Sequence, residues 1–257
     1  MSILLRLIAA GLAKWLLYWP VFNVIIRFVG KLHIVSHDDR PFEDRVEAGR
    51  LLGRELSGLR GQRAVVLGIP RGGLVVAREL ARQIEDDLDI VLSHKLGAPG
   101  NPELAIGAVA EDGRLFLHQD LVGQLGVDSG YIEREKELQL AVLAQRTRQA
   151  RRVLPRATLA GRLVIVTDDG VATGATLQAA LWAARQEKPK KLIAALPVGP
   201  PETIARLAGD ADEMVCLRAP YSFSAVGQFY LRFEQVEDDQ VARLLAEEAA
   251  RRRSHTE

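Results

Sequence analysis

Short apolar runs alternate with amphipathic stretches along most of this chain. The run 163–166 has no polar face, which is typical of a strand buried at the centre of a parallel sheet. Strands that alternate with helices predict an α/β fold in which a parallel sheet is flanked by helices. The expected strands are 63–69, 89–94, 163–166, 191–198 and 213–217, and the expected helices are 42–59, 74–84, 128–152, 177–185, one from 202 and one from 238.

One region between the second and third of these strands interrupts the alternation. Residues 97–102 are expected to form a loop because glycine and proline are frequent there. Residues 104–110 and 115–118 predict the two strands of a hairpin about the turn 111–113.

A second irregular stretch, 219–230, holds four aromatic side chains in a chain with few of them. Its one proline and one glycine are unfavourable for a regular element, so we expect a small C-terminal hood. Its Tyr221 and Phe223 are expected either to stack on a planar ligand as a lid or to close the end of the sheet as an aromatic plug.

Residues 1–37 form a hydrophobic, basic N-terminal arm that contains no acidic residue, and the remainder, 38–257, is expected to form one domain. The uncharged run 15–26 is too short to span a bilayer and is interrupted by Pro20. Basic and tryptophan residues among leucines favour a segment lying at a membrane surface. A marginal span and packing on protein remain alternatives for this arm.

Composition narrows the class of protein further. The chain has 257 residues, of which 48% are hydrophobic and 26% charged, which suits one sizeable core with an appendage. The net charge of +1 provides no overall field that would favour nucleic acid as a partner. The single cysteine, Cys216, lies in an apolar run, so a buried thiol is expected and an internal disulfide is excluded.

The most informative chemistry follows the strand 163–166. Asp168 and Asp169 come at its carboxyl end, where open α/β sheets bind their ligands. The small residues, threonines and helix start of 170–176 supply N–H groups, hydroxyls and a helix dipole for an anion. Two carboxylates beside such a cradle suit a molecule that carries hydroxyls, a phosphate and a divalent cation.

A second anion-binding turn is predicted where the strand 63–69 meets its helix. Its residues are Pro70, Arg71, Gly72 and Gly73, of which the glycines expose N–H groups and the arginine offers a planar pair of donors. Lys95 is expected to end the strand 89–94 at the same edge of the sheet, where it would neutralise charge on a phosphate leaving group.

The stretch 163–177 resembles the motif of type I phosphoribosyltransferases that binds phosphoribosyl pyrophosphate (PRPP), and the resemblance covers about residues 41–245. It is similar in particular to a bacterial group of predicted phosphoribosyltransferases whose acceptor is not established. The resemblance implies that Asp168 and Asp169 bind the ribose hydroxyls and Mg²⁺, that Pro70–Gly73 and Lys95 bind pyrophosphate, and that the adjoining loop binds the 5′-phosphate. In that loop the phosphate is assigned to Ala172, Thr173, Gly174, Ala175 and Thr176, and Gly170 and Val171 are the other PRPP-binding residues.

The chain departs from parts of the family pattern. The region 97–130, in the slot of the family's catalytic loop, has no lysine, unlike orotate phosphoribosyltransferases. Ala172 stands where hypoxanthine-guanine enzymes carry an acidic general base, although adenine and uracil enzymes also have alanine there. Glu103 and His118 are the remaining candidates for a proton acceptor, and each is more typical of a structural residue.

Two functions follow as expectations. The first is an enzyme that transfers ribose 5-phosphate from PRPP to a nitrogen acceptor such as a nucleobase, with release of pyrophosphate and with Mg²⁺ as cofactor. The alternative is a regulator that senses PRPP or a nucleotide on the same fold without turnover. We expect a cytoplasmic protein, free or held at the inner face of the membrane by residues 1–37, with no nucleic-acid partner; a homodimer remains open.

Overall fold

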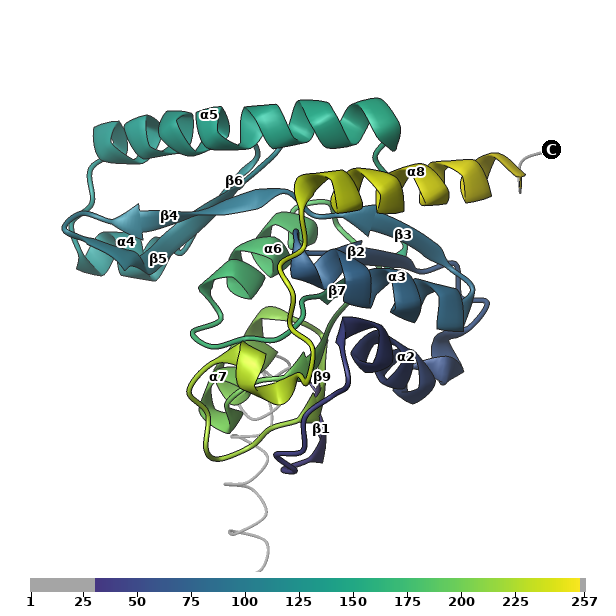
Figure 1. Cartoon of the computed structure of the whole chain (residues 1–257). Helices are drawn as coiled ribbons and strands as arrows, with labels where there is room; N and C mark the ends of the chain where they lie inside the picture. Colours follow the sequence, from purple (N-terminus) through teal and green to yellow (C-terminus); the bar gives the residue numbers. More distant parts are fainter. Residues whose placement is uncertain (1–30, 255–257) are drawn as a thin grey trace, which may run out of the picture.

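The structure, a computed structural model, describes residues 31–254 and is organised around a six-stranded parallel sheet. Figure 1 shows helices on both faces of this sheet, as predicted. The strand order is β1-β9-β8-β7-β2-β3. The strands are β1 (Lys31–Ser36), β2 (Val65–Gly68), β3 (Asp87–Ile90), β7 (Leu163–Thr167), β8 (Lys191–Val198) and β9 (Glu213–Arg218).

Strand β7 lies in the interior of the sheet, between β2 and β8, and is buried on both faces. Ile165 packs into the core beneath α2 (Arg45–Glu55) and α3 (Gly72–Ile84). Val164 and Val166 pack into the opposite core, beneath α6 (Ala175–Arg185) and α7 (Pro201–Leu207). Burial on both faces is the physical reason why this run has no polar side.

The N-terminal arm is shorter than the sequence predicted. Residues 31–36, which the sequence placed in the arm, form β1 and pair in parallel with β9. The pairing continues past the strand, because the N–H of Ala219 donates to the carbonyl of Ser36 at 2.9 Å. The rest of the arm, and with it the predicted membrane contact, lies outside the described residues. Among the helices of residues 31–254, none is both long and apolar enough to cross a membrane.

The boundary between the second and third expected strands is also corrected. Strand β3 ends at Ile90, and the chain then enters a separate antiparallel sheet of β4 (Ser93–Ala98), β5 (Asn101–Ala110) and β6 (Leu115–Leu117). The hairpin of β5 and β6 is confirmed, whereas most of the expected loop 97–102 belongs to β4 and β5. The strands form there because Leu96 and Ile106 are buried in the main core, which also contains residues of the long helix that follows the small sheet.

Helix α5 (Ser129–Val153) extends over this small sheet and reaches α8 (Asp238–Ser254), which Figure 1 shows beside it. Asp128 caps its N-terminus by accepting a hydrogen bond from the N–H of Tyr131 at 2.9 Å. The Tyr131 hydroxyl donates to the carbonyl of Gly97 at 3.0 Å, which fixes the helix on the small sheet. A short helix, α4 (Gln119–Gln124), connects β6 to it.

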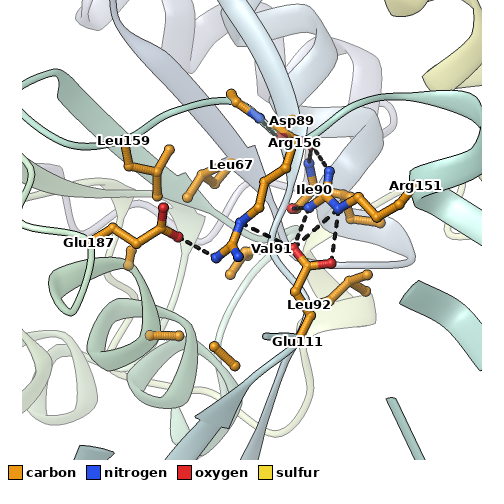
Figure 2. A pocket seen from close by; sticks show the side chains of 14 residues that line it. Leu67, Asp89, Ile90, Val91, Leu92, Glu111, Arg151, Arg156, Leu159 and Glu187 are labelled. Atoms are coloured by element: carbon orange, nitrogen blue, oxygen red, sulfur yellow. Dashed lines mark hydrogen bonds and ion pairs between the residues drawn. The ribbon is translucent and has the colours of Figure 1, made fainter. Parts of the chain in front are cut away.

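A buried ionic cluster joins α5 and the small sheet to the edge of the main sheet (Figure 2). The Arg151 guanidinium lies 2.7 Å from a carboxylate oxygen of Asp89 and 2.6 Å from one of Glu111. The second oxygen of Asp89, a residue only 1% exposed, accepts a hydrogen bond from the N–H of Ala157 at 2.7 Å. A buried carboxylate is tolerated where both of its oxygens have such partners. The cluster encloses a cavity of about 20 Å³, and Arg156 closes another side of it.

Candidate functional site

The two predicted ligand-binding motifs lie side by side at the carboxyl edge of the main sheet. Because β2 and β7 are adjacent and parallel, the residues that follow them leave the sheet together. A methyl group added at Gly72 would lie 2.0 Å from a carboxylate oxygen of Asp169, and one added at Gly73 would lie 2.7 Å from an oxygen of Asp168. The turn therefore needs glycine at both positions to approach the two acids so closely.

The two carboxylates are held by different partners. Asp168 accepts a hydrogen bond at 2.8 Å from the N–H of Asp169, and Asp169 accepts one at 2.7 Å from Nε of Arg45. Enclosure by the protein and the neighbouring charge of Asp169 raise the pKa of Asp168 well above that of an ordinary aspartate. The negative form of Asp168 is thus disfavoured in the protein alone, and a cation bound beside it would offset that cost.

Three residues that the sequence did not single out support Asp169. Arg45 also donates to the carbonyl of Glu234 at 2.7 Å, and its guanidinium lies 3.9 Å from the centre of the Phe233 ring. The Tyr230 hydroxyl donates to the main-chain carbonyl of Asp169 at 2.5 Å, and its ring stacks on Phe233 with centres 5.1 Å apart. Arg45 is one of several arginines on an amphipathic helix, so no local pattern distinguishes it.

Residues of the neighbouring elements hold the loop 170–176 in place. The N–H of Val171 donates to Val198, and the hydroxyl of Thr203 donates at 2.9 Å to the carbonyl of Ala172. Gly174 adopts a left-handed backbone, with φ of 79°, and α6 begins directly after it without a side-chain cap. The exposed Thr173 lies beside these uncapped N–H groups, so the loop suits a bound phosphate.

Arg71 lies in the turn between β2 and α3, after a cis peptide bond that follows Pro70. Its side chain is directed toward the start of α8, with Nη1 3.6 Å from Asp238 and 3.8 Å from Glu237. The side chain is 39% exposed, and these contacts are too long and too exposed to hold it firmly. A phosphate ligand beside the turn is therefore able to compete for the guanidinium.

Lys95 does not lie where the sequence predicted it. It belongs to β4 of the small antiparallel sheet and pairs with Ala108, rather than ending a strand of the parallel sheet. The expected position was wrong because the run 89–94 crosses from one sheet into the other at the end of β3. A role for Lys95 at the pyrophosphate stays a prediction.

The C-terminal hood covers the acidic loop from one side. Val226 limits the space at Gly170, where an added methyl group would lie 2.7 Å from it. Phe223 packs on Phe229 with ring centres 5.0 Å apart, as the plug interpretation expects. Tyr221 is 81% exposed and stacks on His37, so its ring is accessible from solvent.

The described residues offer few candidates for a proton acceptor or a preformed metal site. His118 accepts a hydrogen bond from the N–H of Leu121 and caps α4, which is a structural role. Glu103 lies in β5, and Ala172 is exposed without a functional group. No group of three or more potential ligands gathers within the part of the chain described. Mg²⁺ usually takes one or two carboxylates together with substrate phosphates, so Asp168 and Asp169 fit it.

Comparison with known proteins agrees with this geometry. The phosphoribosyl transferase domain family matches residues 45–234. Two curated relatives from strains of Mycobacterium tuberculosis, each called "Putative phosphoribosyl transferase", are 45% identical over 204 residues, or 79% of this chain. The chain spans 46% of the length of each of these relatives.

A solved structure is similar over nearly its whole length. The crystal structure of TT1426 from Thermus thermophilus is 47% identical and has a TM-score of 0.77. The match covers 80% of this chain and 98% of that one. The elements that carry the acid pair lie within the matched residues 45–234, and the chain belongs to the phosphoribosyl transferase domain family.

Proposed function

We propose that the protein is a PRPP-dependent phosphoribosyltransferase that transfers ribose 5-phosphate to a nitrogen acceptor, a nucleobase being the class we favour. One observation carries the proposal. The acid pair Asp168–Asp169, the turn Pro70–Gly73 and the uncapped start of α6 meet at one edge of the sheet. PRPP has hydroxyls, a pyrophosphate and a 5′-phosphate, and this edge has a matching group for each.

Each part of the site has one task in this reaction. Asp168 and Asp169 accept hydrogen bonds from the ribose hydroxyls and orient the ring, while the loop 170–176 holds the 5′-phosphate. Arg71 and the N–H groups of Gly72 and Gly73 hold the pyrophosphate. The bond between ribose carbon 1 and pyrophosphate breaks as the bond to the acceptor nitrogen forms. The nitrogen loses its proton to water, and pyrophosphate leaves with the electron pair of the broken bond.

Asp168 and Asp169 would hold Mg²⁺, which when bound would neutralise charge on pyrophosphate. A cation there would also favour the ionised form of Asp168, whose pKa is raised by burial and by the charge of Asp169. The exposed ring of Tyr221 is available for stacking on a planar acceptor, and such stacking gives affinity with little specificity.

A panel of acceptors tests the reaction. Purine and pyrimidine bases and small amines are each incubated with the full chain, PRPP and Mg²⁺, and pyrophosphate release is measured. We expect release with one acceptor class only and none when PRPP or Mg²⁺ is omitted. Failure to bind PRPP in calorimetry would contradict the proposal.

The alternative of a PRPP- or nucleotide-sensing regulator is supported by the missing proton acceptor. Ala172 has no carboxylate, and His118 is engaged in capping α4. This alternative expects PRPP to bind without pyrophosphate release across the whole panel. The same experiment therefore distinguishes the two functions.

Replacing Arg45 by methionine is expected to weaken PRPP binding about tenfold to a hundredfold. The change removes the charged hydrogen bond to Asp169, and hydrogen bonds to charged groups contribute about 1.5–3 kcal/mol. Arg45 does not itself need to contact PRPP for this effect, because it positions Asp169. Isothermal titration calorimetry with PRPP and Mg²⁺ measures the affinity.

Arg54 provides the matched control, because it is exposed in the last turn of the same helix. Arg54→Met is expected to leave PRPP affinity unchanged. Equal affinity in Arg45→Met and wild type would show that Asp169 needs no support from α2.

A further inference from the structure

A cavity of about 440 Å³ lies between α5 and α8, bordered at one end by Pro70 and Arg71. Its inner wall is apolar and includes Leu92, Ala150 and Leu245, which come from the start of the small sheet, from α5 and from α8. Small-molecule sites typically have volumes of about 300–1,000 Å³ and mostly apolar linings. The size and the lining of this cavity therefore suit a small organic ligand.

The rim of the cavity carries positive charge that the protein leaves uncompensated. Arg146 and Arg152 project from α5 at this rim, and among residues 31–254 neither lies within ion-pair distance of a carboxylate. Each of the two acids on the opposite rim has an arginine other than Arg146 and Arg152 nearby. Asp239 lies 2.6 Å from Arg243, and Asp238 lies 3.6 Å from Arg71.

We propose that this cavity binds an organic anion whose apolar body fills the space between α5 and α8. Arg146 and Arg152 hold its charged group, a carboxylate, sulfonate or phosphate ester, at the rim. Asp168, Asp169 and the loop 170–176 do not line this cavity, whereas Pro70 and Arg71 of the proposed pyrophosphate turn border one end of it. The cavity therefore adjoins the site proposed for PRPP without containing its acid pair, and the ligand is a molecule other than PRPP, bound beside that turn.

Two fluorescent dyes test the site on the full chain without PRPP, so the result does not depend on the proposed reaction. 8-Anilinonaphthalene-1-sulfonate has an apolar body and one negative charge, and N-phenyl-1-naphthylamine has nearly the same body without the charge. Ala242 lines the cavity on α8, whereas Ala246 is exposed one turn further along. Ala242→Phe is expected to weaken binding of both dyes at least tenfold, and Ala246→Phe to leave it unchanged.

The arginines are tested by a second pair of variants. Arg146→Gln combined with Arg152→Gln is expected to weaken the sulfonate dye about tenfold and to leave the neutral dye unchanged. Arg134 and Arg148 are exposed on α5 and outside the lining, so their double glutamine variant is the matched control. This comparison keeps the test valid if Ala242→Phe fails to fold.

Three results would overturn the proposal. The first is that wild-type protein fails to bind the sulfonate dye. The second is that a folded Ala242→Phe variant binds both dyes as wild type does. The third is that loss of Arg146 and Arg152 leaves the sulfonate dye unaffected or weakens the two dyes equally, because the charge of the ligand would then have no part in binding.

Discussion

Replacing Asp168 and Asp169 together by asparagine abolishes PRPP binding in our expectation and leaves the fold intact. Asparagine keeps the shape of each side chain but removes both negative charges, and it replaces one acceptor oxygen of each carboxylate by an NH₂ donor. The ribose hydroxyls thus lose their charged acceptors, and Mg²⁺ loses its charged ligands. Each charged hydrogen bond contributes about 1.5–3 kcal/mol, so the loss of two or more corresponds to a hundredfold or greater decrease in affinity. Calorimetric titration with PRPP and Mg²⁺ measures it.

The fold should survive because the charge of Asp168 is itself unfavourable. Burial and Asp169 raise the pKa of this carboxyl, so a neutral amide relieves repulsion rather than breaking a core contact. Asp38 and Asp39, another adjacent pair in the coil after β1, provide the control, and their double asparagine variant should bind PRPP normally. Unchanged PRPP affinity in the Asp168/Asp169 variant would refute the assignment of the site.

Arg151→Met is expected to destabilise the protein by about 3–5 kcal/mol, the usual cost of breaking a buried ion pair by removing one partner. The change would leave Asp89 and Glu111 without their shared guanidinium, and Asp89 is almost fully buried (Figure 2). Methionine retains most of the aliphatic volume, so the effect reports charge rather than a cavity. Urea unfolding followed by circular dichroism measures the free energy of unfolding.

Arg148→Met, at an exposed position of the same helix, is the reference for this experiment and should change stability by less than about 0.5 kcal/mol. If Arg151→Met were as stable as this reference, the cluster would not be what fixes α5 and the small sheet to the main sheet.

Elements defined by local patterns were predictable from the sequence. The buried run 163–166 was recognisable because a strand covered on both faces has no polar position. The end of β3 was not predictable, because the residues on either side of it are similarly apolar. Arg151, on a helix distant in sequence, donates to the carbonyl of Ile90 at 3.1 Å and to Asp89. These contacts lie at the point where the chain leaves the main sheet for the small sheet.

Some residues of the candidate site were likewise predictable from the sequence, and others were not. The acid pair Asp168–Asp169, the turn Pro70–Gly73 and the loop 170–176 were found because each is a contiguous motif that follows a strand. Arg45 and Phe233 were missed because nothing in their neighbouring residues marks them. Tyr230 lies in the aromatic stretch 219–230 that the sequence indicated, but its contact with Asp169 forms only in the folded chain.

The contact of Arg45 with the carbonyl of Glu234 bears on how this protein can be shortened for study. A fragment ending before Phe233 would retain every strand of the main sheet, the turn Pro70–Gly73 and the loop 170–176. It would nevertheless lose the aromatic ring and the carbonyl that orient the guanidinium, and Asp169 would then face a loosely held cation. The minimal functional unit therefore extends well beyond the last strand.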